Sequence, residues 1–330
     1  MQIVAWQLEH GRHGLPWQNT RDAYRIWLSE IMLQQTQVAT VIGYYAKFLQ
    51  RFPSVTALAS AQQDDVMAHW AGLGYYSRAR NLHRCAQIVA DQYGGVFPKD
   101  PQLLEQLPGI GRSTAAAIAA FAYGVQAAIL DGNVKRVFCR VFGVEGYPGH
   151  SKVSQQLWEI AERQKPSANI QAYTQGLMDL GASLCSRRKP LCAQCPLSQR
   201  CVAFLSHRQE ELPTRKVKSA PVVKQYSFVW IEADGKVLLE RRPPVGIWGG
   251  LWCFPQAVQG DATLLSDQAY LPGFEHTFTH FKMQASLQRV SASLAVQDNA
   301  RVWVDRSNLE SIGLPAPIKN YLINYFSVTS

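Results

Sequence analysis

The sequence predicts a mainly α-helical N-terminal domain followed by a smaller domain that contains β-strands. Apolar residues recur at helical spacing through about residue 205, as Tyr24, Trp27, Leu28 and Ile31 illustrate. From Tyr226 onward, short strand-like runs replace that pattern. A chain of 330 residues is long enough for two such domains, because single hydrophobic cores rarely grow beyond about 250–300 residues.

The individual elements follow from local composition. The turn Asp234-Gly235 separates the first two predicted strands. Residues 206–224 hold Pro213, Pro221 and four basic side chains, which is typical of an exposed linker. The predicted elements are helices around 24–31, 114–122 and 157–161, and strands at 226–231, 236–239, 283–290 and 301–304.

The charge balance indicates an anionic partner. The formal net charge is +9, and nucleic acid is the commonest partner of such basic chains, although a basic surface without a ligand has the same composition. No apolar run approaches the roughly 20 residues of a transmembrane helix, and nothing at the N-terminus resembles a signal peptide. We therefore expect a cytoplasmic, bacterial-type, nucleoid-associated monomer with no membrane partner.

Four cysteines carry the strongest local signal. Cys185, Cys192, Cys195 and Cys201 follow the spacing C-x6-C-x2-C-x5-C, which supplies enough thiolates for one metal centre. Zinc sites more often contain two short C-x2-4-C pairs, so this spacing favours a [4Fe–4S] cluster, with zinc as the alternative. Disulfides are disfavoured without a secretory signal. The remaining cysteines, which are expected to be small core residues, are Cys85, Cys139 and Cys253.

A glycine-rich turn precedes the Ala-rich helix, in the sequence Leu107-Pro-Gly-Ile-Gly-Arg-Ser-Thr114. Gly109 and Gly111 lack side chains, so backbone N–H groups at the start of the next helix can approach a DNA phosphate. An ordinary interhelical turn is the alternative. Asp131 follows an apolar run and precedes Gly-Asn, where it either caps the next helix or serves in a site.

Together, the hairpin, Asp131 and the cysteines resemble the endonuclease III superfamily of DNA glycosylases. The resemblance implies a helix-hairpin-helix fold with one [4Fe–4S] cluster, and places Asp131 in the cleft beside the hairpin. Bifunctional members carry a lysine nucleophile where this chain has Ser113, and serine cannot form a Schiff base. Glu30 lies among large apolar residues on a predicted helix, where desolvation raises a carboxyl pKa, and Gln34 is expected one turn later on the same face.

These residues, with the aromatic and basic run 72–80, resemble the adenine DNA glycosylase (MutY) family over nearly the whole chain. The C-terminal motifs 241–244 and 246–255 resemble the start of an α+β Nudix domain. The glutamate cluster that binds Mg²⁺ in Nudix hydrolases is missing after Pro255, which argues against a nucleotide hydrolase. The resemblance implies a recognition domain for 8-oxoguanine, with its loop at 275–280. Thr279 stands where the family usually has Ser.

The resemblance also implies roles for single residues. Glu30 is the general acid, Asp131 stabilises the sugar cation or traps it covalently, and Ser113 and Asn133 polarise water or hold Asp131. Trp17 and Gln175 line the adenine pocket. The expected DNA contacts are Gln34, Gln35, Thr36, Leu73, Tyr75, Gly109, Gly111, Arg187 and Arg188, and the expected 8-oxoguanine contacts are Phe278, Thr279 and His280.

The expected organisation is a catalytic domain at 1–205, a linker at 206–224 and a Nudix-like domain at 225–330. Within the catalytic domain, the resemblance implies a six-helix module at about 17–127, and a cluster module made of the N-terminus and 128–205. The expected activity is monofunctional removal of adenine opposite 8-oxoguanine or guanine in double-stranded DNA. The alternatives are an endonuclease III-type glycosylase/lyase acting on oxidised pyrimidines and a non-catalytic Fe–S DNA-binding protein.

Overall fold

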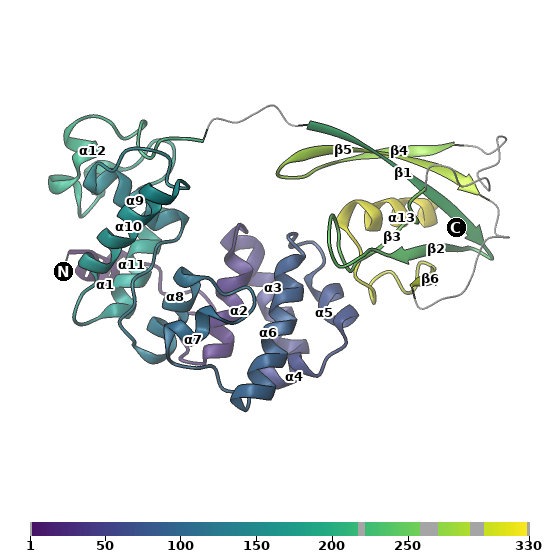
Figure 1. Cartoon of the computed structure of the whole chain (residues 1–330), viewed down its shortest axis with the longest axis horizontal. Helices are drawn as coiled ribbons and strands as arrows, with labels where there is room; N and C mark the ends of the chain where they lie inside the picture. Colours follow the sequence, from purple (N-terminus) through teal and green to yellow (C-terminus); the bar gives the residue numbers. More distant parts are fainter. Residues whose placement is uncertain (1, 217–221, 258–269, 291–299, 329–330) are drawn as a thin grey trace. The chain divides into compact units, whose positions relative to one another are not determined.

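A computed structural model describes residues 2–216, 222–257, 270–290 and 300–328. The chain divides into two compact units, one formed by 1–59 with 84–218 and the other by 60–83 with 219–330 (Figure 1). The first unit is helical, and the second combines a sheet with helices. The sequence did not indicate that 60–83 group with the C-terminal half.

The helices of the first unit confirm the helical prediction for the N-terminal half. Its helices are α1 (Gln2–His10), α2 (Ala23–Leu33), α3 (Val38–Arg51), α4 (Val55–Ala59), α7 (Pro101–Glu105), α8 (Arg112–Tyr123), α9 (Gly132–Phe142), α10 (Ser151–Gln164), α11 (Ile170–Ala182) and α12 (Val202–Leu205). Two 3-10 turns, Cys192–Gln194 and Ser198–Arg200, precede α12. Helix α5 (Gln63–Trp70) belongs to the second unit, and α6 (Ser77–Tyr93) runs through both.

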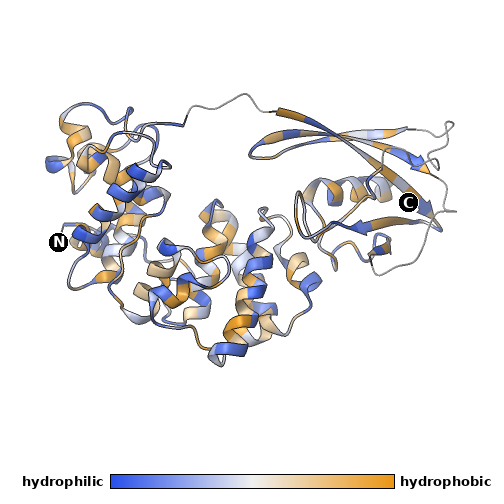
Figure 2. Ribbon diagram, viewed as in Figure 1, coloured by the Kyte–Doolittle hydropathy of each residue, from blue (hydrophilic) through white to orange (hydrophobic). Residues whose placement is uncertain are grey.

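Local sequence explains where the central helices begin and end. Asp22 caps α2 by accepting a hydrogen bond from the N–H of Tyr24 at 2.9 Å. Helix α8 ends at Gly124 and α9 at Gly143, both left-handed, a conformation that glycine adopts without steric cost. The apolar faces of these helices pack on one another and form one core across α8, α9, α10 and α11 (Figure 2).

Helix α11 lies very close to its neighbours because two of its residues are glycines. A Cβ at Gly176 would lie 2.7 Å from the Ile3 side chain on α1, and one at Gly181 would lie 2.6 Å from the Cβ of Asn133 on α9. Both approaches are closer than carbon atoms tolerate. The glycines therefore set the spacing of three helices, and Gly181 brings α11 against the residues that follow Asp131.

The second unit contains a sheet with strand order β3-β2-β1-β5-β4, and β6 pairs with β2. The strands are β1 (Val222–Ala233), β2 (Lys236–Arg241), β3 (Trp252–Cys253), β4 (Tyr270–Thr277), β5 (Phe281–Val290) and β6 (Arg301–Val304). Strands β1 and β5 are parallel, and the other pairs are antiparallel. Helix α13 (Ala316–Val328) packs on this sheet through Tyr321 and Tyr325, whose rings contact Trp230 on β1.

The four strands predicted from sequence are confirmed within β1, β2, β5 and β6, while β3 and β4 were not predicted. The loop assigned to 275–280 is wrong in its first half, because Glu275–Thr277 pair with β5 as the end of β4. Leu212 is buried, and its carbonyl accepts a hydrogen bond from Arg140, so the beginning of the predicted linker packs on the first unit. Lys218 and Pro221 of that linker, and the positions 258–260 after Pro255, lie outside the described residues.

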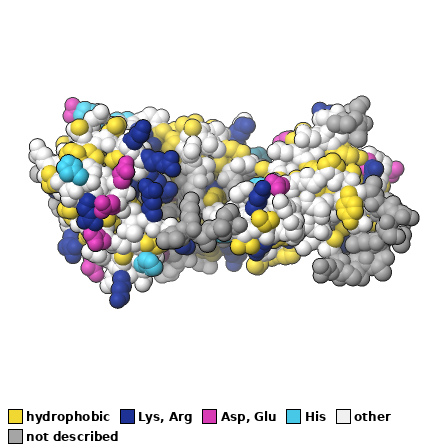
Figure 3. All heavy atoms as spheres, turned by 90° about the horizontal axis from the view of Figure 1, so that it is seen from above, with side chains coloured by type: hydrophobic (Ala, Val, Ile, Leu, Met, Phe, Trp, Pro, Cys, Tyr) yellow, Lys and Arg dark blue, Asp and Glu magenta, His cyan; other side chains and the backbone are white. Residues whose placement is uncertain are grey.

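Two properties of the structure are relevant to whether the chain binds nucleic acid or a membrane. Several Lys and Arg side chains gather on one part of the first unit (Figure 3). Within the described ranges, no helix has both the length and the apolar character needed to cross a bilayer.

The close approach of α11 to α9 predicts that a glycine-to-alanine substitution has opposite effects on stability at two positions. Gly181→Ala forces a methyl group against Asn133 and should lower the free energy of unfolding by about 1–3 kcal/mol, as overpacking does. Gly43→Ala, on the exposed face of α3 with open space around it, should instead raise it by about 0.5–1 kcal/mol. Urea midpoints from circular dichroism compare the two, and a stabilised Gly181→Ala protein would contradict the proposed contact.

Candidate active site of the helical unit

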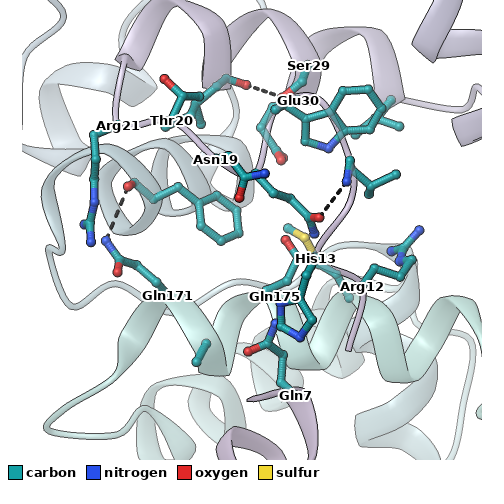
Figure 4. Close-up of a pocket in the computed structure, with 18 of the residues that line it drawn as sticks. Gln7, Arg12, His13, Asn19, Thr20, Arg21, Ser29, Glu30, Gln171 and Gln175 are labelled. Atoms are coloured by element: carbon teal, nitrogen blue, oxygen red, sulfur yellow. Dashed lines mark hydrogen bonds between the residues drawn. The ribbon is translucent and has the colours of Figure 1, made fainter. Parts of the chain in front are cut away.

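A pocket in the first unit brings together segments that are distant in sequence. Its lining comes from residues 7–21, from α2 and the start of α3, and from α11 (Figure 4). Its volume is about 330 Å³, which falls within the range of roughly 300–1,000 Å³ typical of small-ligand sites. Trp17, Glu30 and Gln175, three residues singled out from the sequence, all line it.

Trp17 forms an apolar wall of this pocket. Its side chain is buried, and its ring packs edge-on against Tyr45 of α3, with centroids 5.4 Å apart. Gln175 lies on α11, at the side of the pocket away from Ser29 and Thr20 (Figure 4). A flat aromatic wall and a convergent amide are suited to a planar heterocycle with polar edges.

Glu30 is the one carboxylic acid that lines the pocket among the described residues. It projects from α2, whose neighbouring side chains Trp27, Leu28 and Ile31 are buried. Desolvation by this apolar surrounding and, second, the negative charge of Asp131 together raise the pKa of Glu30 to about 8. Glu30 therefore carries a transferable proton at neutral pH, as predicted from the sequence.

Asp131 is held at the N-terminus of α9. Its Oδ1 accepts a hydrogen bond from the N–H of Val134 at 2.7 Å, so the capping interpretation of this residue is also correct. Burial raises the pKa of Asp131, while the N–H groups of Val134 and Asn133 and the charges of Arg136 and Lys135 oppose that rise. Glu30 has no such opposing contribution, so Asp131 is the first of the two to ionise.

Ser113 and Asn133 hold the backbone around Asp131. The hydroxyl oxygen of Ser113 accepts a hydrogen bond from the N–H of Leu130 at 3.0 Å. The side-chain oxygen of Asn133 accepts one from Arg136 at 2.9 Å. Of the two roles expected for these residues, these contacts favour holding Asp131 rather than polarising water.

The predicted hairpin joins α7 to α8. Gly109 has φ +80°, a left-handed conformation that favours glycine, and Gly111 is the N-cap of α8. A Cβ on Gly111 would meet no atom within 4 Å, so internal packing does not require glycine there. The open space in front of the α8 N-terminus is what an approaching phosphate needs. Arg112 does not reach into it, because its guanidinium stacks 3.9 Å above the Trp158 ring and pairs with Glu162.

The residues after α2 depart from the sequence prediction. Helix α2 ends at Leu33, and Gln34 has ψ 108°, so Gln34 does not share a helical face with Glu30. Gln35 is exposed with φ +59°, and Thr36 is half-buried. The left-handed backbone conformation of Gln35 reverses the chain between α2 and α3. The Gln35 side chain is exposed to solvent at this turn.

The four predicted metal ligands line one cavity between α9, the end of α11 and the loop up to α12. No cysteine of the described chain forms a disulfide, and Cys85, Cys139 and Cys253 are buried core residues as predicted. Arg140 is buried and donates a hydrogen bond to the Sγ of Cys185 at 3.3 Å. Among the described side chains, no group of three or more His, Cys, Asp or Glu is arranged to hold a single metal ion.

A thiolate-bound cluster fits this cavity chemically. Four thiols are the complete ligand set of a [4Fe–4S] cluster, and buried guanidinium groups offset the charge of thiolates. Besides Arg140, the buried Arg136 donates a hydrogen bond to the carbonyl of Cys185 at 2.7 Å. The neighbouring basic residues Arg187 and Arg188 are exposed, as expected for DNA contacts.

The second unit holds the remaining predicted contacts. Leu73 is buried, whereas Tyr75 is 44% exposed with φ +48°. The hydroxyls of Tyr75 and Thr279 lie 3.2 Å apart, a pairing that joins the segment 60–83 to the turn between β4 and β5. An ion pair between Arg241 and Asp64, 2.5 Å long, also joins that segment to the sheet.

The β4–β5 turn (Phe278–His280) is packed against aromatic side chains at Phe278 and exposed to solvent at Thr279 and His280. Phe278 stacks on Phe281 at 4.6 Å, and its ring also contacts His276 and Trp248. Its N–H donates to the carbonyl of Phe281 at 2.9 Å. Thr279 and His280 are exposed. The turn therefore presents two polar side chains to solvent, and the hydroxyl of Thr279 is at the same time paired with that of Tyr75.

Sequence reasoning missed Arg12 and Asp179. Asp179 is buried, and Arg12 bonds to it twice, although 167 residues separate the two. The one available signal was the position of Asp179 one helical turn after Gln175.

Comparisons with known proteins agree with this geometry. Residues 28–163 match the HhH-GPD superfamily of base excision DNA repair proteins, and residues 226–324 match the NUDIX domain. A thermostable thymine-DNA glycosylase of known structure is 32% identical with a TM-score of 0.57, covering 62% of this chain and 94% of that one.

Curated relatives cover more of the chain. An adenine DNA glycosylase of Buchnera aphidicola subsp. Acyrthosiphon pisum is 36% identical over 98% of this chain and 96% of its own length. The adenine DNA glycosylase of Homo sapiens is 33% identical over 85% of this chain and 64% of its own length. With this similarity extending through the helical unit, the pocket and the Nudix-like sheet, the chain belongs to the adenine DNA glycosylase family.

Proposed function

We propose that this chain hydrolyses the N-glycosidic bond of adenine paired with 8-oxoguanine or guanine in double-stranded DNA. The observation that carries the proposal is the pocket containing Glu30, whose pKa is about 8, beside the electrostatically coupled Asp131. Adenine must leave the base stack before it can enter such a pocket. The volume and the Trp17 wall suit one flipped base.

The two carboxyl groups act on different parts of the substrate, Glu30 on the leaving base and Asp131 on the sugar. Adenine is a poor anionic leaving group, so protonated Glu30 donates a proton to the base as the bond to the sugar breaks. The sugar then carries developing positive charge, which ionised Asp131 stabilises or traps covalently, as in retaining glycoside hydrolysis. Water completes the hydrolysis. Ser113 supplies no amine, so no Schiff base forms and the enzyme is monofunctional.

We further propose that Cys185, Cys192, Cys195 and Cys201 hold one [4Fe–4S] cluster with a structural role. The shared cavity and the hydrogen bond from Arg140 to Cys185 support this assignment. The chemistry such a cluster supplies here is cross-linking of the loop, which presents Arg187 and Arg188 to the DNA backbone.

For the opposite base, we propose that Gln35, Thr36 and Tyr75 contact the distorted duplex, and that the β4–β5 turn reads 8-oxoguanine. The exposed Thr279 and His280, held in place by the stacked Phe278, support this role. The lesion differs from guanine by one carbonyl oxygen and one N–H. Polar contacts to a base edge are worth about 1–3 kcal/mol of discrimination, which is enough to separate the two.

A cleavage assay tests the proposed function. Under single-turnover conditions, the full chain should release adenine from an A:8-oxoguanine duplex and leave a strand that breaks only after alkali treatment. Asp131→Asn keeps the shape but removes the charge, and should slow release by about a hundredfold or more while duplex binding persists. Strand breakage without alkali would indicate a lyase, and an unchanged rate in Asp131→Asn would exclude its catalytic role.

The raised pKa of Glu30 predicts a pH dependence of the chemical step. Glu30 is protonated below about pH 8, so the single-turnover rate should fall as pH rises through that value. Glu30→Gln should lower the rate about 10²–10⁴-fold. Between pH about 4.5 and about 8 the folded state keeps a proton that the unfolded state releases, so stability should fall with rising pH. Glu30→Gln should flatten that slope, and an unchanged slope would contradict the assigned pKa.

The proposed cluster predicts iron in the purified protein. Anaerobically purified chain should be brown and contain about four irons per molecule, because four thiolates complete one cluster. Cys192→Ser should lower the iron content and the yield of soluble protein, whereas Cys85→Ser, in the core away from the cavity, should keep its iron. A colourless, zinc-containing and fully active protein would overturn the assignment.

The proposed recognition turn predicts a loss of lesion preference. Thr279→Ala combined with His280→Ala should reduce the ratio of rates on A:8-oxoguanine and A:G duplexes by about tenfold, the loss of about one polar contact. Thr277→Ala, at a threonine on β4 that is also exposed, serves as the matched control. All measurements use one salt concentration, because phosphate contacts make affinity salt-dependent. If the double variant and the control have equal rate ratios, the β4–β5 turn does not recognise 8-oxoguanine.

A further inference from the structure

Asp179 is a buried carboxylate on α11, next to the pocket-lining Gln175. Its side chain is 1% exposed and accepts three hydrogen bonds. Two come from Arg12, through its backbone N–H at 2.9 Å and its Nε at 2.6 Å. The third comes from the side-chain nitrogen of Gln175 at 2.8 Å. These bonds tie the segment around Arg12 and the pocket-lining amide to one buried charge.

This arrangement fixes which end of the Gln175 amide faces the pocket. A carboxylate paired with a guanidinium accepts hydrogen bonds and donates none, so the amide must turn its NH₂ group toward Asp179. The carbonyl oxygen of Gln175 then points away from Asp179. Among the described residues, none donates a hydrogen bond to that oxygen. Gln175 lines the pocket, so it offers the base a fixed hydrogen-bond acceptor.

We propose that Asp179 is a positioning residue that makes the pocket selective for a purine with an amino group at C6. The inference rests on the proposed function. Adenine presents an NH₂ donor at C6, which matches the carbonyl of Gln175, whereas hypoxanthine and guanine present a carbonyl acceptor there. A free amide would rotate and accept either base, because its NH₂ and its oxygen exchange places at little cost. The buried carboxylate removes that freedom.

The experiment compares three duplexes that differ only in the base opposite guanine: adenine, hypoxanthine or unsubstituted purine. Wild-type protein should prefer adenine to hypoxanthine. Asp179→Asn can donate as well as accept, so it releases the amide, and the adenine-to-hypoxanthine ratio of single-turnover rates should fall about tenfold. The rate on purine, which has no group at C6, should change much less. An equal slowing of all three substrates would show a merely structural role and overturn the proposal.

Two further variants complete the test. Ser183→Ala removes a hydroxyl that bonds the main-chain carbonyl of Asp179 at 2.7 Å and leaves its carboxylate untouched, so it should keep the wild-type ratio. If Asp179→Asn does not fold, Gln175→Met removes the acceptor while Asp179 stays paired with Arg12. The same fall in the ratio is then expected, and an unchanged ratio overturns the proposal. Wild-type protein that releases no adenine would instead refute the proposed function.

Discussion

The catalytic site that we propose depends on keeping a proton on Glu30 while Asp131, its neighbour, is ionised. Two carboxyl groups in equivalent surroundings would share their protons evenly, but these surroundings differ. Glu30 projects from α2 among buried apolar side chains, and both burial and the charge of Asp131 raise its pKa. Asp131 sits at the N-terminus of α9, where two backbone N–H groups stabilise its charge. That charge in turn raises the pKa of Glu30, which favours the protonated form of Glu30.

The helix-capping contact of Asp131 and the catalytic role that we propose for it therefore depend on the same interaction. The N–H of Val134, in the first turn of α9, is both the group that Asp131 caps and a donor that favours the carboxylate. Ser113 fixes Leu130 just before it, and Gly181 lets α11 approach Asn133 just after it. Each contact acts on the backbone rather than on a substrate. The position of the charge is thus set by the same packing that stabilises α8, α9 and α11.

Local patterns in the sequence predicted much of this arrangement, because helix periodicity, glycine turns and cysteine spacing are properties of short segments. Strand β4 escaped prediction because it contains Pro272 and Gly273, which suggest a loop but are tolerated on an edge strand with a bulge. The end of α2 before Gln34 has no strong stop signal. Contacts such as Arg12 with Asp179, or Tyr75 with Thr279, join residues 167 and 204 positions apart, and no local pattern encodes them.

Helix α11 links the pocket to the cysteine loop, so the cluster that we propose for this loop would also affect the pocket. Four residues of α11 line the pocket, among them Gln175, and the carbonyl of Gly181 near the end of the helix accepts a hydrogen bond from Arg136 at 2.6 Å. Arg136 also bonds the carbonyl of Cys185 and belongs to α9, the helix that Asp131 caps. Disorder in the cysteine loop would remove the hydrogen bond from Arg136 to Cys185, one of the contacts that hold this side chain between α9 and α11. The buried guanidinium thus couples the order of the loop to the position of Asp131, without any redox step.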